Sequence, residues 1–337
     1  MIEKMNTPLV SIVMPSFNKL KLLMDMVDCI QRQTYSNWEL IVVDDGSTED
    51  NINKINSLND PRIKAIPRPR APKGGQTCRN IGFDLSTGKY VVFFDSDDLI
   101  DEICLEQRVT FMEANPNIDF GIFPSLDFTE IEDLKKAIPY RGVENPREDA
   151  LTSFLAARFQ YTVWTNIYRR ESLVKKNITW DEEILVYQDF DFNISTLAAN
   201  LKYRFCKNAK PDYFYRISYT ADTVCSTFSD SKFKSTESLI EKILVRLSMK
   251  EDYNQRKNEF LGFILQHFDR LLHHEDMGYV NTFLVILDKY YGGTVGFRYK
   301  MAAMLSELFC FNKYVVIMSL TFFCGSSIYV KQLLSKF

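Results

Sequence analysis

Hydrophobic and polar positions over the first 100 residues follow two alternating patterns, which predict strands separated by helices. Short apolar runs with the length of buried strands cover 9–14, 39–43, 62–66 and 90–94. Helical spacing of apolar residues lies between them, at 20–33, 50–58 and from 76 to the glycine at 88. Strands joined by helices pair in parallel, and the helices cover both faces of the sheet. These residues therefore predict an α/β fold with a Rossmann-like, mostly parallel sheet.

Acidic residues follow two of the predicted strands at the point where each strand ends. Asp44 and Asp45 come after the second strand, and Asp95, Asp97 and Asp98 come after the fourth. Ligands of open α/β sheets bind beyond the carboxyl ends of the strands. We therefore expect the two sets of carboxylates to share one edge of the sheet.

The remainder of the chain shows a mixed region followed by long helices. A helix is predicted over 103–115, and 127–147 is polar and typical of a loop. Further strands are predicted at 120–123, 161–168 and 212–217. After about residue 231 the apolar positions follow a helical period, which predicts a helical C-terminal region.

Composition and charge narrow the classes of function. The chain has 337 residues, of which 46% are hydrophobic and 25% charged, as in ordinary globular proteins. Its net charge of -3 and pI of about 5.8 argue against nucleic-acid binding. Seven scattered cysteines suit reduced thiols better than a disulfide framework. Because the first apolar run begins within ten residues of Met1, we expect no signal peptide and a cytoplasmic location.

The sequence Asp95-Ser96-Asp97 carries the first candidate chemistry. Hard cations such as Mg²⁺ and Mn²⁺ bind carboxylate and phosphate oxygens, and two carboxylates on one turn can face both an ion and a nucleotide. By itself the motif has low specificity, because acidic turns after strands are common. Asp98 could also cap a helix that begins near Asp101.

Five motifs, in this order and spacing, resemble family 2 glycosyltransferases, which have the GT-A fold. They are 10–18 (VSIVMPSFN, with Phe17 in place of the usual Tyr), 33–35 with 38–47 (QTY, WELIVVDDGS), 79–82 (RNIG), 88–90 (GKY) and 94–98 (FDSDD). The resemblance implies an inverting enzyme that moves a sugar from a nucleotide-diphosphate donor to a hydroxyl of a glycan or lipid-linked saccharide. It also implies Mn²⁺ or Mg²⁺ as cofactor and a place in surface polysaccharide synthesis.

The resemblance assigns the nucleotide to residues near the first two strand ends. Pro15, Phe17 and Asn18 would border it, with Phe17 against the base or ribose. Asp45 would accept a hydrogen bond from an imide N–H of the base, which favours a UDP-sugar. From the residues alone, the acidic pair that contains Asp45 could equally be a turn.

The donor diphosphate and the cation are assigned to the fourth strand end and the helix before it. Arg79 would lie near the diphosphate or ribose, although a surface salt bridge is the alternative. Asp97 is the predicted metal ligand, Asp95 is shared between metal and ribose, and Ser96 lines the same donor site. Cys78, which stands where the family usually has Ala, is interpreted as a small buried residue.

The family's catalytic base is the Asp of a Glu-Asp pair ahead of a helix. Here Asp189 aligns with that Asp, and Gln188 replaces the Glu. A neighbouring Glu could raise the pKa of the base by like-charge repulsion, which Gln cannot do. Asp191 is the rival base, and Asp189 could also be a helix N-cap.

Three more residues are candidates with open alternatives. Residues 213–216 (YFYR) resemble the family's Tyr-Arg strand, which makes Arg216 a candidate for a second diphosphate contact. The His and Ser that usually follow are absent. Trp164 and Trp180 could stack on an acceptor sugar or belong to the core.

The C-terminal tail, 296–337, carries five basic residues against one acidic residue. No residue between 314 and 330 is charged, and aromatic residues are frequent there. Such a tail fits peripheral docking on the anionic inner face of the plasma membrane. A helix buried against the core or against a second copy in a homodimer is the alternative.

The predicted organisation is therefore a nucleotide-sugar-binding subdomain at 1–115, an acceptor-binding and catalytic-base subdomain at 116–230, and a helical region at 231–337. Two other functions fit parts of the sequence. A sugar nucleotidyltransferase would need a Gly-rich basic loop after the first strand, but 15–21 contains no glycine. A non-catalytic binding protein of the same fold would fit the replacement at Gln188.

Overall fold

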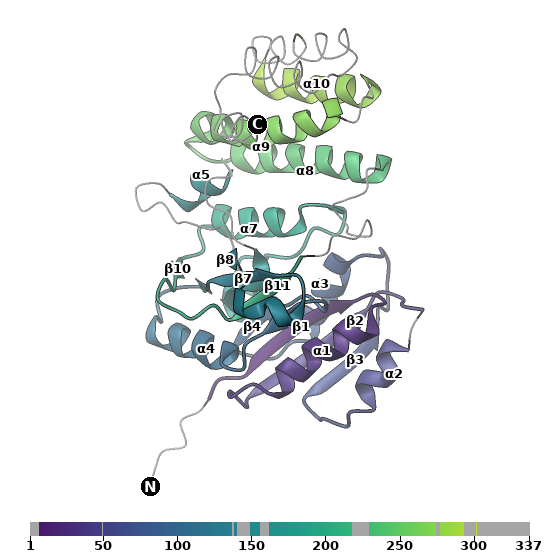
Figure 1. Ribbon diagram of the computed structural model, residues 1–337. Helices are drawn as coiled ribbons and strands as arrows, with labels where there is room; N and C mark the ends of the chain where they lie inside the picture. Colours follow the sequence, from purple (N-terminus) through teal and green to yellow (C-terminus); the bar gives the residue numbers. More distant parts are fainter. Residues whose placement is uncertain are drawn as a thin grey trace. The chain divides into compact units, whose positions relative to one another are not determined.

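The computed structural model describes residues 7–48, 50–136, 138–139, 149–155, 162–217, 229–273, 277–292 and 301. The chain forms two compact units (Figure 1). The first consists of Met1–Glu144 and Tyr161–Thr227, and the second consists of Asn145–Gln160 and Phe228–Phe337.

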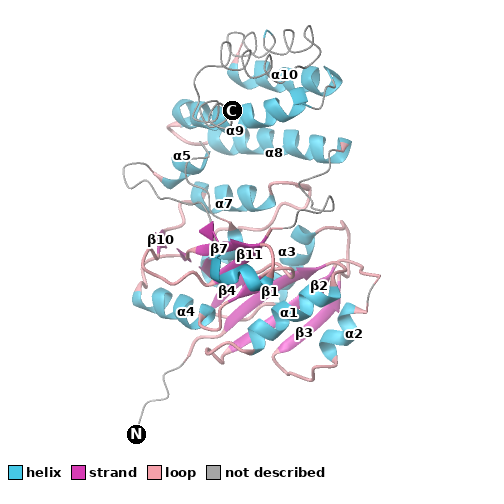
Figure 2. Ribbon diagram, viewed as in Figure 1, coloured by secondary structure: helices cyan, strands magenta, loops and turns pink. Residues whose placement is uncertain are grey.

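The first unit contains strands and helices in alternation, as Figure 2 shows. The strands are β1 (Val10–Ser16), β2 (Trp38–Asp44), β3 (Ile63–Pro67), β4 (Tyr90–Phe93), β5 (Leu99–Ile100), β6 (Phe120–Ile122), β7 (Ser125–Phe128), β8 (Ile138–Pro139), β9 (Asn166–Arg169), β10 (Tyr203–Phe205) and β11 (Tyr213–Arg216). The helices are α1 (Leu20–Gln31), α2 (Asn51–Asn56), α3 (Gly75–Leu85), α4 (Cys104–Ala114), α6 (Arg170–Lys175) and α7 (Gln188–Ala198), with 3-10 turns at Ile131–Lys136 and Val163–Thr165.

The main sheet has the strand order β10-β6-β9-β4-β1-β2-β3, in which only β9 runs antiparallel to its neighbours. The register pairs Ser16 with Asp44, and Asp44 with Pro67. Val13 of β1 pairs with Phe93 of β4. The carboxyl ends of these strands therefore meet at one edge, which confirms the predicted placement of both acidic clusters.

Alternate residues of the central strands face two different layers. Ile12 of β1 belongs to the core cluster that includes Leu23 of α1 and Leu105 of α4. On the other face, Ile41 of β2 packs with residues of α3. Gly82 allows α3 to approach β1 closely, because a Cβ at this position would lie 2.5 Å from Cγ1 of Val13. This close approach sets the position of the helix that carries Arg79.

A smaller sheet with the order β5-β11-β7-β8 lies beside the acidic turn (residues 95–98). β5 begins directly after Asp98 and pairs antiparallel with β11. Behind β11, Arg108 of α4 forms a fully buried ion pair with Asp212 at 2.7 Å. The same guanidinium donates to the backbone oxygens of Trp164 and Asn166. This network ties α4 and the Trp164 segment to the start of β11.

Two sequence-based predictions of secondary structure were wrong. The polar stretch 127–147 was predicted as a loop, but β7 extends into it and pairs with β8. The segment 161–168 was predicted as one strand, but its described part forms a 3-10 turn before β9. In the first place the local pattern is overridden by the pairing of β7 with β11, which is distant in the chain.

The second unit is helical in its described residues. It contains α5 (Ala150–Leu155), α8 (Asp230–Ser248), α9 (Tyr253–His273) and α10 (Met277–Tyr291). Ser229 caps α8 by accepting a hydrogen bond from the N–H of Lys232. The predicted helical C-terminal region is confirmed for these residues. The tail at 296–337, apart from residue 301, lies outside the described residues, and the three predicted subdomain ranges stay a prediction.

Candidate functional site

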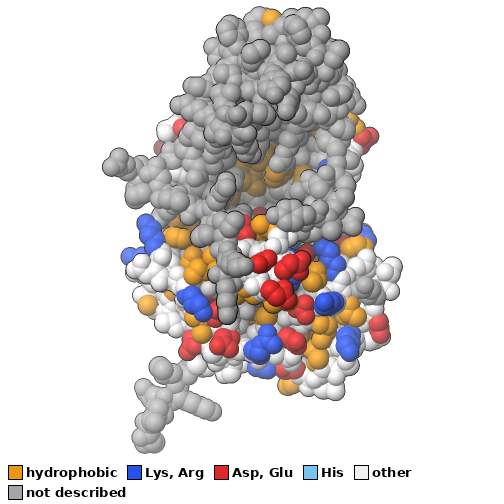
Figure 3. Space-filling model, in the orientation of Figure 1, with side chains coloured by type: hydrophobic (Ala, Val, Ile, Leu, Met, Phe, Trp, Pro, Cys, Tyr) orange, Lys and Arg blue, Asp and Glu red, His pale blue; other side chains and the backbone are white. Residues whose placement is uncertain are grey.

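The carboxyl edge of the main sheet gathers the residues that the sequence singled out. β1, β2 and β4 end there, and the loop from Pro67 to α3 runs beside them. Figure 3 shows acidic side chains gathered on one face of the first unit, with basic side chains beside them. The partners of each acid distinguish its role.

Asp44 is a structural residue of the turn after β2. Its carboxylate accepts hydrogen bonds from the backbone N–H groups of Gly46 and Ser47, and from the hydroxyls of Ser16 and Ser47. Burial would raise the pKa of Asp44, but these hydrogen bonds hold it below its usual value. A carboxylate with so many internal donors shapes the loop and is not available for a ligand.

Asp45 faces the loop before α3. Its Oδ1 accepts from Nε of Arg68 at 2.6 Å and from the N–H of Gly74 at 3.1 Å. Gly74 has φ +147°, a conformation that other residues rarely adopt. The thiol of Cys78 lies 3.7 Å from the same oxygen, and burial together with the Asp45 charge raises its pKa to about 12. Cys78 is therefore a small buried residue, as predicted, and its raised pKa disfavours the nucleophilic thiolate.

The residues after β1 form the exposed side of this region. Phe17 is 45% exposed, and the Nζ of Lys73 lies 3.8 Å from the centroid of its ring. Asn18 is held by the next loop, because its N–H donates to Oγ of Ser47 and its Oδ1 accepts from the N–H of Thr48. Phe17 therefore presents an accessible ring of the kind on which a base can stack.

Pro15 lies one position before the end of β1. It pairs in register with Val43 and is partly buried. Phe17 and Asp45 follow the ends of these two paired strands. The structure thus brings Pro15, Phe17, Asn18 and Asp45 to one edge; their role toward a nucleotide stays a prediction.

Arg79 connects the acidic turn to helix α7. Its Nη2 lies 2.5 Å from Oδ1 of Asp95, and its Nη1 donates to Oε1 of Gln188 at 3.0 Å. The guanidinium also lies 4.5 Å from the centroid of the Trp180 ring. Because Arg79 is only 9% exposed, it is not the surface salt bridge that the sequence left open.

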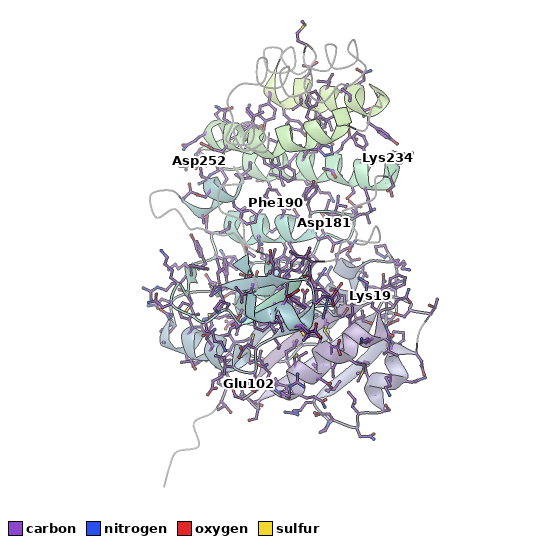
Figure 4. All side chains as sticks on the ribbon, in the orientation of Figure 1. Lys19, Glu102, Asp181, Phe190, Lys234 and Asp252 are labelled. Atoms are coloured by element: carbon purple, nitrogen blue, oxygen red, sulfur yellow. The ribbon has the colours of Figure 1, made fainter. Side chains whose placement is uncertain are left out.

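Asp97 and Asp98 have opposite environments although they are adjacent. The Asp97 side chain is 40% exposed, and its carboxylate lies 3.1 Å from Nζ of Lys19, which Figure 4 labels. Asp98 is 1% exposed and accepts hydrogen bonds from Tyr213 and the N–H of Arg216. Burial, together with the charges of Asp97 and Asp95, raises the pKa of Asp98 well above its usual value. Asp98 does not cap α4, which begins at Cys104.

The donor set at this turn fits a hard cation only in combination with a ligand. In the part of the chain that the structure describes, no three His, Cys, Asp or Glu side chains gather as a complete metal site. Asp97 is accessible, and Asp95 and Ser96 are partly exposed beside it. Magnesium sites with one or two carboxylates and substrate phosphates have this composition. Diphosphate oxygens would complete the coordination.

Asp189 lies in the first turn of α7, directly after the residue that Arg79 binds. Burial raises its pKa to about 6; the charge of Arg79 opposes this shift, and that of Asp95 adds to it. A carboxyl group with a pKa near neutrality suits a general base. Asp191, the rival, is only 2% exposed.

Sequence reasoning missed a second link between the donor loop and the segment before α7. Glu182 accepts two hydrogen bonds of 2.6 Å from Arg70, and Asn80 donates to it at 2.8 Å. Asn80 also exchanges two hydrogen bonds of 2.9 Å with the backbone of Trp180. Because these contacts join residues about 100 positions apart, no local sequence pattern predicts them. The adjacent arginine and asparagine at 79–80 were the sequence feature that could have indicated this link.

The two tryptophans belong to the core. Each is 3% exposed. Trp164 stacks on Tyr213 with 4.5 Å between ring centroids, and Trp180 stacks on Phe192 at the same distance. Of the two interpretations left open from the sequence, the structure favours the core position over a sugar platform.

Comparison with known proteins identifies the family. The family model described as "Glycosyl transferase family 2" matches residues 11–179, which is half of the chain and contains the carboxyl ends of β1, β2 and β4. This chain belongs to glycosyl transferase family 2. The resemblance of the five motifs to this family is thereby confirmed.

Several curated relatives support this assignment. The chain is 37% identical over 116 residues to the UDP-Glc:alpha-D-GlcNAc-diphosphoundecaprenol beta-1,3-glucosyltransferase WfgD of Escherichia coli, covering 34% of this chain and 45% of that protein. It is 27% identical over 256 residues to the GalNAc(5)-diNAcBac-PP-undecaprenol beta-1,3-glucosyltransferase of Campylobacter jejuni, covering 74% and 79%. Its alignment with an uncharacterized glycosyltransferase of Haemophilus influenzae, at 41% identity, covers 33% and 45%. In the alignments with the Haemophilus influenzae and Escherichia coli proteins, the chain spans about half the length of the relative.

Solved structures share the fold over nearly the whole chain. TarS 1–349 of S. aureus, in a complex with UDP-GlcNAc, superimposes with a TM-score of 0.69 at 16% identity, covering 93% of this chain and 91% of TarS. The mannosyltransferase PcManGT of Pyrobaculum calidifontis, with GDP-Man and Mn²⁺, gives 0.53 at 13% identity, covering 98% and 87%. The likeness confirms the predicted GT-A fold class. None of the helices that the structure describes is long and apolar enough to cross a membrane.

Proposed function

We propose that this chain is an inverting, metal-dependent hexosyltransferase that moves a sugar from a UDP-linked donor to a hydroxyl of a lipid-linked saccharide. One observation carries the proposal: Arg79 binds Asp95 of the acidic turn and Gln188 at the start of α7. Asp189 follows Gln188 and feels the charges of Arg79 and Asp95. Groups suited to the donor and to the acceptor therefore lie around one guanidinium.

In the proposed reaction, each residue performs a task that its environment supports. Phe17 and Asp45 hold the base, the first by stacking and the second as a hydrogen-bond acceptor. Asp189 accepts the proton of the acceptor hydroxyl. The hydroxyl oxygen attacks the anomeric carbon from the face opposite the diphosphate, and the bond to the diphosphate breaks. Asp97 and Asp95 would hold Mn²⁺ or Mg²⁺, which neutralises charge on the leaving diphosphate when bound.

The names of two relatives support the proposed acceptor. The enzymes of Escherichia coli and Campylobacter jejuni are both named for undecaprenol-diphosphate acceptors. A chain of the same family that works on such acceptors would act at the inner face of the membrane, as a peripheral protein. Surface polysaccharide synthesis is the process that uses acceptors of this type.

Turnover of defined substrates tests the proposal. The purified chain with Mn²⁺ is supplied with UDP-glucose, UDP-GlcNAc, UDP-galactose or GDP-mannose, together with a short-chain lipid-diphosphate saccharide. Release of nucleoside diphosphate is measured, and the product's anomeric configuration is read by NMR. We expect one UDP-sugar to be used with inversion. Retention of configuration or exclusive use of GDP-mannose contradicts the proposal, and the absence of any turnover favours a non-catalytic binding protein.

Matched variants test the assignment of the base. Asp189→Asn should lower kcat by about a thousandfold, because general-base catalysis typically contributes 10²–10⁴. Donor affinity should stay unchanged, because an asparagine side chain has nearly the shape of the aspartate that it replaces. Asp191→Asn is the control, with the same chemical change two positions further along the helix. A large loss in the control with normal turnover in Asp189→Asn would reverse the assignment.

A further inference from the structure

The acidic turn is fastened to β11 by four hydrogen bonds. The hydroxyl of Tyr213 accepts from the N–H of Asp95 at 3.1 Å and donates to Oδ2 of Asp98 at 2.7 Å. The N–H of Arg216 donates to Oδ1 of Asp98 at 2.8 Å, and its Nε donates to the backbone oxygen of Asp97 at 2.8 Å. Tyr213 therefore holds Asp95, Arg216 holds Asp97, and both hold Asp98, although they lie more than 110 positions away in the chain.

The two holding residues are themselves fixed. Tyr213 is fully buried, with its ring stacked on Trp164 and 5.3 Å from the ring of Phe94. The guanidinium of Arg216 lies 4.5 Å from the centroid of the Phe128 ring. β11 is paired with β5 on one side and with β7 on the other. A rigid strand, rather than a loop, thus supports the turn.

These hydrogen bonds give the three carboxylates different exposure and different partners. Asp98 satisfies both of its oxygens on β11 and is 1% exposed. Because its neighbour is anchored inward, the Asp97 side chain leaves the turn on the solvent side, where it is 40% exposed. Asp95 is oriented by Arg79. Preorganised ligands bind a cation more tightly, since less conformational freedom is lost on binding.

We propose that Tyr213 and Arg216 are positioning residues that hold the acidic turn in the shape in which Asp97 and Asp95 can share a divalent cation with the donor diphosphate. The inference rests on the proposed function and deepens it, because it separates Asp98 from the two candidate ligands. Residues that hold metal ligands typically contribute 10- to 100-fold to metal affinity.

Removal of the single hydroxyl tests this role. Tyr213→Phe keeps the stacked ring and removes the bridge between Asp95 and Asp98. Binding of Mn²⁺ to the UDP-saturated protein is measured by the EPR signal of free Mn²⁺, and binding of UDP without metal is measured by calorimetry. We expect about a tenfold weaker Mn²⁺ affinity and an unchanged UDP affinity. Tyr215→Phe is the matched control, because Tyr215 lies on the same strand and also stacks on Trp164; it should bind Mn²⁺ as the wild type does.

A second variant covers the case in which Tyr213→Phe does not fold. Arg216→Met keeps the backbone N–H to Asp98 but removes the hydrogen bond to the backbone oxygen of Asp97, and Mn²⁺ affinity should fall severalfold. Wild-type Mn²⁺ affinity in the folded variants overturns the positioning role and leaves the proposed transferase function intact. If the wild-type protein turns over UDP-sugar but binds no Mn²⁺, the positioning role and the metal dependence are overturned together, while the transfer itself stands.

Discussion

Arg79 donates a hydrogen bond of 3.0 Å to Oε1 of Gln188, the residue that stands where family 2 glycosyltransferases usually carry a glutamate. The other end of the same guanidinium binds Asp95. A glutamate at 188 would bring a second carboxylate to Arg79 and a third to this cluster, which already contains Asp189. The amide keeps the hydrogen bond without the charge. The departure from the family pattern is therefore accommodated by the local geometry.

The first prediction concerns the pH dependence of the wild-type enzyme. Burial, with the charge of Asp95 adding to it and that of Arg79 opposing it, raises the pKa of Asp189 to about 6. The base works only when ionised, so kcat/KM should fall tenfold per pH unit below about pH 6 and should level off above it. The residual activity of Asp189→Asn should lack this acid limb. An acid limb near pH 4 in the wild type would contradict the assignment.

The second prediction concerns Gln188→Glu. A carboxylate next to Asp189 disfavours its ionised form, so the acid limb should move upward by about one pH unit. The pH profile of kcat/KM measures the shift. Gln188→Met, which is uncharged and similar in size, is the control and should leave the limb where it is. If both variants move the limb equally, the shift does not come from the added charge.

The third prediction concerns donor recognition. Asp45→Asn removes the negative charge that binds Arg68 and the N–H of Gly74. It also weakens the hydrogen-bond acceptor that we propose for the nucleotide base. UDP affinity should fall by about 10- to 100-fold, the value of a hydrogen bond to a charged group. Calorimetry with UDP measures it. Asp60→Asn, which breaks a partly exposed pair with Arg62, is the control and should bind UDP normally.

The fourth prediction concerns stability. Asp212→Asn leaves the buried guanidinium of Arg108 without its counter-charge, which should cost about 3–5 kcal/mol in the free energy of unfolding. Urea unfolding followed by circular dichroism measures the loss. The double variant Arg108→Met with Asp212→Leu removes both charges and should be the more stable of the two. A double variant that is less stable than Asp212→Asn would show that the attraction within the ion pair exceeds the free-energy cost of burying its two charges.

Much of the fold could be read from the sequence, because it depends on patterns that are local. The apolar runs that became β2 and β4 end where acidic residues begin, and the parallel pairing of both strands with β1 then places those ends together. The strands β7 and β8 were missed in the polar stretch at 127–147. They are short, and their pairing partners include β11, far along the chain.

That acidic residues meet at one sheet edge can be predicted from the chain's local pattern, since strand period and strand direction are properties of short segments. The role of each acid depends on long-range contacts. Asp44 accepts hydrogen bonds from its own turn, and Asp98 accepts one from Tyr213 at a separation of 115 residues. Asp97 remains accessible. The physical reason is that a carboxylate's availability depends on which donors reach it, and donors brought by distant strands leave no trace in the local pattern.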